Sequence, residues 1–319
     1  MNPIRILAAA TAMEIAAAAA LLAIAGVGGS RNGWLDVINN FAPMIMAAGL
    51  IGLGLAYGTL EGATRVATVG LGLIAVAYGL VLTGPELARL RVPRFGVGPR
   101  FSVLSANVWH DNPTPDLAVS SIIALNADAV FLQESDGTIQ ASLARLKSHY
   151  PFMSDCPGAG VQIFAKTPIL AQGCGSTAAP RDLVWIRTAG PNGQPVTLVT
   201  THFSWPFPPE PQRADRTNLA RQIHQLPLDD MILAGDFNTT PWSFAMKTQD
   251  NLFAPLKRQT IAWFSWPARL DALAQPWPLP ILPIDHVYSG PSWRLALMSR
   301  VRIPGSDHFA TEAAFTRVR

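Results

Sequence analysis

The chain has 319 residues, of which 49% are hydrophobic and 14% are charged, and its formal net charge is +3. Residues 1–100 are rich in Ala, Gly, Leu and Ile and carry seven arginines against four acidic residues, whereas residues 101–319 carry 17 basic and 17 acidic residues. The whole is too apolar for a typical soluble protein. The neutral C-terminal part argues against a dedicated duplex-DNA binder, which usually presents a basic surface, although locally segregated charge keeps that class open.

Three apolar segments, Ile6–Val27, Leu35–Tyr57 and Ala63–Leu82, each approach the roughly 20 residues that a helix needs to cross a bilayer. The alternatives are a buried helical core in a soluble protein or, for the first segment only, a cleaved signal peptide. Glu14 makes that segment a poor signal core and could serve either a polar contact inside the bundle or a function. We therefore predict three transmembrane helices.

The predicted organisation has three parts. Residues 1–84 form the transmembrane anchor, residues 85–100 form a stiff, basic linker that contains prolines, and residues 101–319 form the large domain. Three spans place the two termini on opposite sides of the membrane. The arginines after the last span favour a cytoplasmic domain under the positive-inside rule.

The two cysteines favour the opposite orientation. Cys156 and Cys174 flank two expected strands, Val161–Ala165 and Ile169–Gln172, which we predict to form a hairpin. A disulfide between them would suit an oxidising compartment, and two unpaired core residues are the alternative. On this evidence we predict that the large domain lies outside the cytoplasm.

Residues 101–319 alternate between short apolar runs and two helical patterns, at Asp116–Leu125 and near Gln212–Gln225. Strands outnumber helices, and several are apolar on both faces, which predicts two sheets packed face to face with helices outside. The further expected strands are Phe101–Val108, Ala129–Gln133, Val196–Thr201, Met231–Ala234, Ile284–Tyr288, Leu295–Arg302 and Thr311–Thr316.

Polar side chains that can bind metal or transfer protons follow most of these apolar runs. Each alone has an ordinary explanation as a turn former or a solvated strand end. Together they supply hard oxygen ligands, amide donors and imidazoles, the groups that bind Mg²⁺ and hydrolyse a phosphate ester. The set comprises Asn107, Glu134, His202, Asp236, Asn238, Asp285, Asp307 and His308.

In the order and spacing of these motifs, residues 101–319 resemble the endonuclease/exonuclease/phosphatase superfamily. Gly-Asp-Phe-Asn at residues 235–238 is a modest signal alone, whereas six motifs in order are a strong one. The resemblance implies a four-layered α/β sandwich and a metal-dependent phosphoric ester or anhydride hydrolase. It also implies that Glu134 and Asn107 bind Mg²⁺, with Mn²⁺ as the alternative, and that Asp307 lies near metal and water.

The resemblance assigns the remaining residues to catalysis. Asp236 and Asn238 would orient the attacking water and the phosphate. His308 would be the catalytic imidazole with Asp285 as its partner, and His202 would donate to a phosphate oxygen or to the leaving group. His286 faces the other side of its strand, so we expect it to pack rather than to catalyse.

The anchored architecture resembles bacterial membrane phosphatases linked to glycopeptide resistance, which implies a lipid-linked phosphate or pyrophosphate, such as undecaprenyl pyrophosphate, as substrate. It also implies a bacterial inner-membrane protein with a periplasmic catalytic domain. Aromatic stretches at residues 203–209 and 263–267 could rest at a lipid interface or fill the core. An anchored nuclease acting on nucleic acid and an inactive membrane scaffold are the competing hypotheses. The sequence leaves the oligomeric state open.

Overall fold

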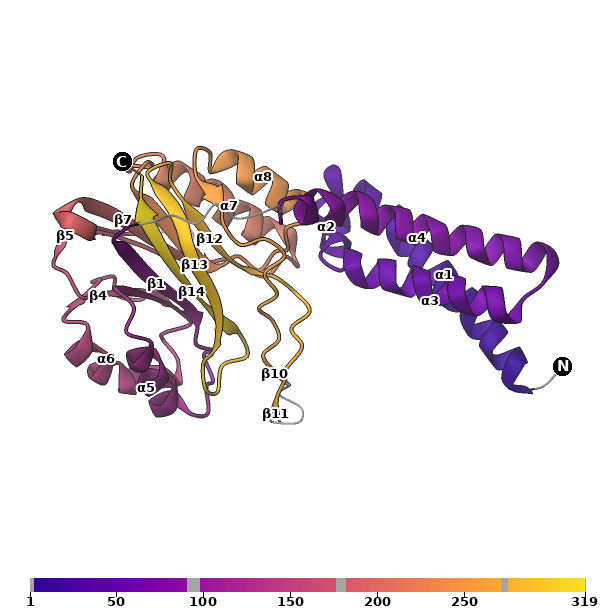
Figure 1. The fold of residues 1–319 in the computed structure, drawn as a ribbon, viewed down its shortest axis with the longest axis horizontal. Helices are drawn as coiled ribbons and strands as arrows, with labels where there is room; N and C mark the ends of the chain where they lie inside the picture. Colours follow the sequence, from indigo (N-terminus) through magenta and orange to yellow (C-terminus); the bar gives the residue numbers. More distant parts are fainter. Residues whose placement is uncertain (1–2, 91–97, 176–181, 271–274, 319) are drawn as a thin grey trace. The chain divides into compact units, whose positions relative to one another are not determined.

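The computed structural model describes residues 3–90, 98–175, 182–270 and 275–318 (Figure 1). The chain forms two compact units. We call the first the helical unit, which comprises Met1–Arg91 together with two short segments from later in the chain, Phe207–Glu210 and Thr240–Lys247. The second, the sheet unit, contains Val92–Pro206, Pro211–Thr239 and Thr248–Arg319.

The helical unit contains three helices that are long and apolar enough to cross a membrane. They are α1 (Pro3–Val27), α3 (Ala42–Thr59) and α4 (Gly62–Ala88), and a 3-10 turn (Gly28–Ser30) and the short helix α2 (Gly33–Asn39) separate α1 from α3. The second expected span, Leu35–Tyr57, is therefore wrong at its start, because residues 33–39 form a separate helix.

Glycine allows the long helices to approach closely. A Cβ atom on Gly49 of α3 would lie 2.8 Å from the backbone oxygen of Gly72 in α4, and one on Gly52 would lie 3.0 Å from the side chain of Ala16 in α1. The expected linker at residues 85–100 begins later than predicted, because α4 continues through Pro85 to Ala88. Residues 91–97 of that linker lie outside the described residues.

The sheet unit contains a first six-stranded sheet in the order β13-β14-β1-β2-β4-β3. Its central strands β1 and β2 are parallel, and α5 (Pro115–Leu125) lies between them in the chain. The strands are β1 (Arg100–Asn107), β2 (Ala129–Gln133), β3 (Phe152–Met153), β4 (Val161–Ala165), β13 (Trp293–Arg302) and β14 (Phe309–Arg317). A 3-10 turn (Thr138–Ser142) and α6 (Leu143–His149) follow β2.

The second six-stranded sheet has the order β5-β6-β7-β8-β12-β9 and repeats this plan, since β7 and β8 are parallel with α7 (Pro209–Ile223) between them. Its strands are β5 (Ile169–Cys174), β6 (Leu183–Ala189), β7 (Pro195–His202), β8 (Met231–Asp236), β9 (Lys257–Arg258) and β12 (Asp285–Ser289). The remaining elements are a 3-10 turn (Pro191–Gly193), α8 (Phe244–Leu252), β10 (Arg269–Leu270) and β11 (Gln275–Pro276).

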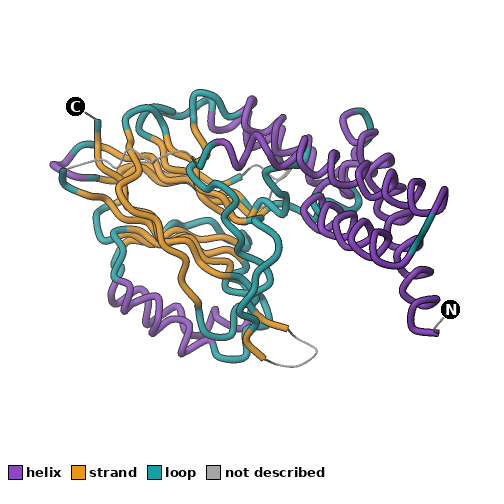
Figure 2. The backbone as a smooth tube through the Cα atoms, turned by 45° about the vertical axis from the view of Figure 1, so that its right-hand side comes forward, coloured by secondary structure: helices purple, strands orange, loops and turns teal. Residues whose placement is uncertain are grey.

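The two sheets lie face to face (Figure 2). Apolar side chains of both sheets form the core between them, among them Phe131, Ile163, Ile186, Leu198 and Phe315. A second core lies between the first sheet and α5 and α6, so the outer face of this sheet is also buried. The predicted α/β fold, with two packed sheets, flanking helices and three preceding apolar helices, is confirmed.

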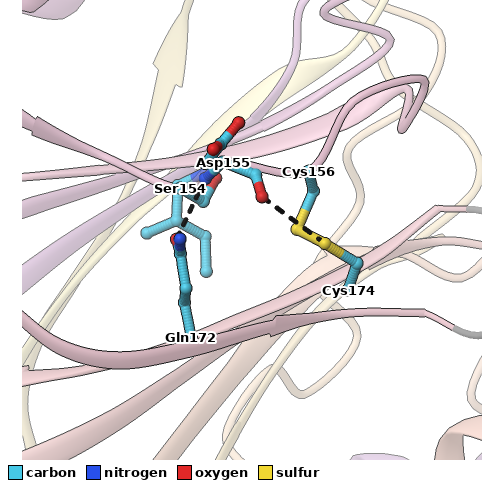
Figure 3. The surroundings of a disulfide bond; sticks show 6 residues. Ser154, Asp155, Cys156, Gln172 and Cys174 are labelled. Carbon is cyan, nitrogen blue, oxygen red and sulfur yellow. Dashed lines mark hydrogen bonds between the residues drawn. A yellow bond between two sulfur atoms is a disulfide. The ribbon is translucent and has the colours of Figure 1, made fainter.

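A disulfide between Cys156 and Cys174 connects the two sheets (Figure 3). Cys156 precedes β4 of the first sheet, and Cys174 ends β5 of the second. The predicted hairpin of these two strands is wrong, because β4 pairs with β2 and β3 whereas β5 pairs with β6. The turn between β4 and β5 instead carries the chain from one sheet to the other.

Candidate active site

Four of the predicted site residues lie at the carboxyl ends of the two parallel strand pairs. Asn107 ends β1 and Glu134 directly follows β2, whereas His202 ends β7 and Asp236 ends β8. Parallel neighbours end at the same edge of a sheet, and His202 lies opposite Asp236 in register. The Nδ2 atom of Asn107 donates to Oδ2 of Asp236 at 3.1 Å, so the ends of the two sheets meet.

Two further residues lie at the starts of antiparallel strands, which share an edge with the ends of their neighbours. Asp285 begins β12 and lies opposite Asp236 of β8 in register. His308 directly precedes β14, which runs antiparallel to β1. The fold therefore brings carboxylates and imidazoles from both sheets to one place.

Asp236 is the centre of this group. Its carboxylate is buried, and its Oδ2 atom lies 3.7 Å from Nε2 of His202 and 3.7 Å from Nε2 of His308. Burial raises the pKa of Asp236 to about 6, and Asp285 adds to this, while the two histidines oppose it. This carboxyl can therefore exchange a proton close to neutral pH.

His308 and Asp285 form a buried dyad. The Nδ1 atom of His308 lies 2.9 Å from Oδ2 of Asp285, and their side chains are only 5% and 6% exposed. Burial alone would lower the pKa of His308, but the carboxylates of Asp285, Asp236 and Asp307 outweigh it and raise the pKa to about 10. The imidazole is therefore held positively charged, with Nε2 directed to the centre of the site.

Glu134 forms the more open side of the site, where its side chain is 23% exposed. Its Oε1 atom accepts a hydrogen bond of 2.8 Å from Nδ2 of Asn107, and its Oε2 atom accepts one of 2.7 Å from the backbone of His110. The backbone of Glu134 has a φ of 56°, a left-handed conformation that is uncommon for residues other than glycine. Asn107 thus bridges the carboxylates of Glu134 and Asp236.

Asp307 supplies an acceptor that can take a cation. Its Oδ2 atom accepts a hydrogen bond of 3.1 Å from Nε1 of Trp266, whereas its buried Oδ1 atom has no hydrogen-bond partner among the described residues. Buried polar atoms are rarely left without a partner, and burial also raises the pKa of this carboxyl. Although Nε2 of His308 lies 4.0 Å from Oδ1, this oxygen is free of hydrogen bonds among the described residues, and together with the carboxylate of Glu134 it fits a hard divalent ion such as Mg²⁺.

A second combination of possible metal ligands consists of Asp236, Asp285 and His308, whose ligand atoms lie within 4.8 Å of one another. The hydrogen bond between Asp285 and Nδ1 of His308 already engages two of these groups. For this reason we keep the side of Glu134 and Asp307 as the predicted metal position. The arrangement gives no preference between Mg²⁺ and Mn²⁺, because both take oxygen ligands.

Asn238 completes the group, so all eight predicted residues lie together. Its backbone donates to Oδ1 of Asp236 at 2.8 Å, and its Nδ2 atom donates to the backbone oxygen of Phe203 at 2.9 Å. Nδ2 also lies 3.4 Å from Nε2 of His202. The individual roles assigned to these residues remain predictions.

The sequence analysis missed two residues that hold the site. Nε2 of Gln212 on α7 donates to the backbone oxygen of Asn238 at 2.9 Å, and no motif marks this glutamine. Nε1 of Trp266 bonds Asp307, although its segment was considered only as a lipid contact or core. His286 is buried, and its Nε2 atom lies 2.9 Å from the backbone oxygen of Thr239, which agrees with its predicted packing role.

Comparison with known proteins identifies the family of this domain. The model of the Endonuclease/Exonuclease/phosphatase family matches residues 104–308, which is more than half of the chain. Among curated proteins, none matches the sequence.

Solved structures share the fold. TDP2 of D. rerio, in complex with a single-strand DNA product, is 20% identical with a TM-score of 0.56, over 69% of this chain and 100% of that one. An endonuclease/exonuclease/phosphatase from Bacteroides vulgatus is 16% identical with a TM-score of 0.55, over 69% and 100%. Beta toxin of Staphylococcus aureus is 15% identical with a TM-score of 0.50, over 67% and 99%.

Proposed function

This chain belongs to the endonuclease/exonuclease/phosphatase family, and from this premise we propose that it is a membrane-anchored, Mg²⁺-dependent phosphohydrolase acting on a lipid-linked phosphate or pyrophosphate, such as undecaprenyl pyrophosphate. Members of the family are metal-dependent phosphoester hydrolases. The observation that carries the proposal is that one chain combines the buried site around Asp236 with three helices of membrane-spanning length. An enzyme held at the bilayer gains effective concentration only for substrates that are found there.

In the proposed mechanism, water attacks the phosphorus atom directly, without a covalent enzyme intermediate. Asp236, with a pKa of about 6, accepts a proton from the water that it orients together with Asn238. His308, which Asp285 keeps positively charged, stabilises the negative charge that builds on the phosphoryl oxygens, and His202 donates to the same group. A divalent cation bound by Glu134 and Asp307 would supply further positive charge.

The aromatic residues that follow His202 support a lipid substrate. Trp205 and Phe207 are 66% and 63% exposed, and large apolar side chains at such exposure are favoured at a membrane interface. By contrast, Nε1 of Trp263 donates to Oγ1 of Thr311, and Trp266 binds Asp307. Trp205 and Phe207 therefore support a lipid contact, whereas Trp263 and Trp266 contribute to the structure of the domain.

We place the catalytic domain on the periplasmic side of a bacterial inner membrane. The support is the Cys156–Cys174 disulfide, since such bonds persist in oxidising compartments. A C-terminal alkaline phosphatase fusion should then be active, and a C-terminal green fluorescent protein fusion should not fluoresce. The reverse result would agree with the cytoplasmic location that the arginines predict. It would contradict both the periplasmic location and the periplasmic lipid carrier as substrate.

The full-length protein in detergent micelles should release phosphate from undecaprenyl pyrophosphate in the presence of Mg²⁺. Phosphate release should stop when EDTA is added. His308→Ala should release none, which excludes a contaminating phosphatase. His149→Ala is the matched control, because this exposed histidine bonds the Asn126 side chain and packs on the neighbouring Tyr150 ring, neither of which is a site residue. Cleavage of a single-stranded oligonucleotide without release of phosphate from the lipid would establish the nuclease alternative. Absence of Mg²⁺ binding together with absence of either activity would establish the inactive scaffold.

A further inference from the structure

The helical unit contains a buried polar network around α2. Asp36 lies in the first turn of this short helix, Asn39 ends it and Asn40 follows it, and the three are 7%, 0% and 5% exposed. Burying a carboxylate and two amides is costly unless each finds hydrogen-bond partners. Their partners therefore indicate what this part of the unit is built to hold.

The partners belong to the segment Thr240–Lys247 of the same unit. The Oδ1 atom of Asn40 accepts hydrogen bonds from the backbone nitrogen of Thr240 at 2.9 Å and from its hydroxyl at 3.0 Å. The backbone oxygen of Asn40 accepts from Nε1 of Trp242 at 2.9 Å. The segment is thus fixed by both the side chain and the backbone of one residue.

Asp36 holds the other end of the segment. Its Oδ1 atom accepts from the backbone nitrogen of Phe244 at 2.9 Å, and its Oδ2 atom accepts from that of Ala245 at 2.7 Å. These groups form the first turn of α8, where a helix leaves backbone donors unsatisfied and favours negative charge. Asp36 is therefore a cap supplied from a distant part of the chain.

Residues of the long helices contact this network through Asn39. Nδ2 of Asn39 donates to Asp36 at 2.7 Å, and the hydroxyl of Tyr78 on α4 donates to Oδ1 of Asn39. Two glycines leave room for it, since a Cβ atom on Gly26 would lie 2.2 Å from the Tyr78 hydroxyl and one on Gly29 would lie 2.5 Å from Nδ2 of Asn39. The packing of the helices thus places the α2 side chains.

The segment held in this way continues directly from the catalytic motif. Thr240 follows Asn238 by two residues. Within the sheet unit, the backbone oxygen of Asn238 is bound by Gln212 and that of Thr239 by His286. Asn238 itself has a φ of 48°, a left-handed conformation that persists only when its neighbours hold it. The hydrogen bonds from Thr240 to Asn40 hold the next residue of this turn.

We propose that Asp36 and Asn40 are positioning residues, which fix the path of the chain after Asp236 and Asn238 and so set the orientation of the Asn238 side chain. The membrane-spanning part of the protein then supports catalysis in addition to anchoring it. A displacement of about 1 Å in a positioned group can lower a rate about 100-fold. The inference rests on the hydrolase activity proposed above, but not on the identity of the lipid.

The test uses the full-length protein in detergent and bis(p-nitrophenyl) phosphate with Mg²⁺, a soluble diester that needs no lipid site. Asn40→Ala should lower kcat at least about tenfold and leave KM within about twofold, because the turn is loosened while the substrate pocket stays. Asn40→Asp keeps the acceptor for Thr240 and should restore most of the kcat. Asp36→Asn, a milder change of the cap, should also lower kcat. Failure on the lipid substrate alone would overturn the proposed substrate and leave this test standing.

Thr83→Ala is the matched control for damage to the helices, since Thr83 is buried in α4 and, among the described residues, its hydroxyl donates only to Gly79 of its own helix. Hydrogen exchange gives a readout independent of activity: the amides of Thr240, Phe244 and Ala245 should exchange faster in the Asp36 and Asn40 variants and not in the control. Faster exchange with an unchanged kcat would overturn the proposal, because the contact would then be structural only. An equal loss of kcat in Thr83→Ala would also overturn it.

Discussion

The two sides of the active site differ in burial and in the partners of their charged groups. On the dyad side, His308 and Asp285 are almost fully buried and satisfy each other at 2.9 Å. On the side of Glu134, the carboxylate is 23% exposed and accepts from the amide of Asn107, and Oδ1 of nearby Asp307 has no hydrogen-bond partner among the described residues. A satisfied, water-excluded pair suits proton and charge control, whereas open carboxylates suit a hydrated cation.

Asp236 lies between the two sides and contacts residues of both. It accepts from Asn107 at 3.1 Å and faces Nε2 of His308 at 3.7 Å. If the sides have separate tasks, changes on the dyad side should lower kcat at saturating metal, and changes on the other side should raise the metal concentration that is needed. Measuring both quantities for each variant tests this division.

The largest effect is expected from His308→Ala, which removes the buried imidazolium. We expect kcat at saturating Mg²⁺ to fall about 10²- to 10³-fold, the range for removing one preorganised group that stabilises transition-state charge, with Mg²⁺ affinity changed less than about threefold. Steady-state kinetics and calorimetric Mg²⁺ titration measure the two quantities, and thermal unfolding checks the fold. A kcat equal to that of the wild type would remove His308 from the mechanism.

Asp285→Asn should lower kcat about 10²-fold, because the imidazole stays but loses the carboxylate that keeps it charged. Burial lowers the pKa of His308, and Asp285 is the largest influence that opposes it, so the pKa should fall from about 10 and the charged form should be lost at lower pH. An NMR titration of the metal-free protein measures this without repulsion from a bound cation. An unchanged His308 pKa would show that the dyad does not set the charge.

Glu134→Gln should act mainly through the metal. Replacing one carboxylate oxygen by an amide nitrogen should raise the Mg²⁺ concentration for half-maximal activity about 10- to 100-fold, and kcat at saturation should recover to within about tenfold of the wild type. Asp136→Asn is the matched control, since this carboxylate lies two residues away and its side chain is 54% exposed. If both variants need the same Mg²⁺ as the wild type, the cation binds elsewhere, and the cluster of Asp236, Asp285 and His308 becomes the better position.

The sequence predicted the site more completely than its surroundings, for a physical reason. Strands with strong apolar runs, such as β2 at Ala129–Gln133, end where the chain becomes polar, and parallel pairing brings those ends together. The residues Asn107, Glu134, His202 and Asp236 could therefore be expected at strand ends before the structure was known. The α/β class followed from the same alternation.

Long-range partners could not be predicted in this way. Nothing near Gln212 shows that its side chain reaches the backbone of Asn238, because this depends on how α7 packs. The assumed hairpin of β4 and β5 failed because a short turn can also connect two different sheets. The polar residues Asp36 and Asn40 were included in a predicted membrane span because a hydropathy value is averaged over a window of neighbouring residues. It does not register a hydrogen bond to a residue 200 positions later in the chain, such as that between Asn40 and Thr240.

The smallest effect on turnover is expected from the double variant Cys156→Ser and Cys174→Ser. This variant also tests whether the two sides of the active site have separate tasks. The disulfide closes a loop with a separation of 18 residues, and its removal should lower the free energy of unfolding by about 3 kcal/mol. The same loop contains Gly160, whose backbone oxygen accepts from Ser135 at 2.8 Å, next to Glu134. Metal affinity should therefore weaken up to about threefold while kcat at saturating Mg²⁺ stays unchanged, and the wild type treated with dithiothreitol should behave in the same way. A fall in kcat without a change in metal affinity would mean that the loop supports the dyad, and the assignment of separate tasks to the two sides would fail.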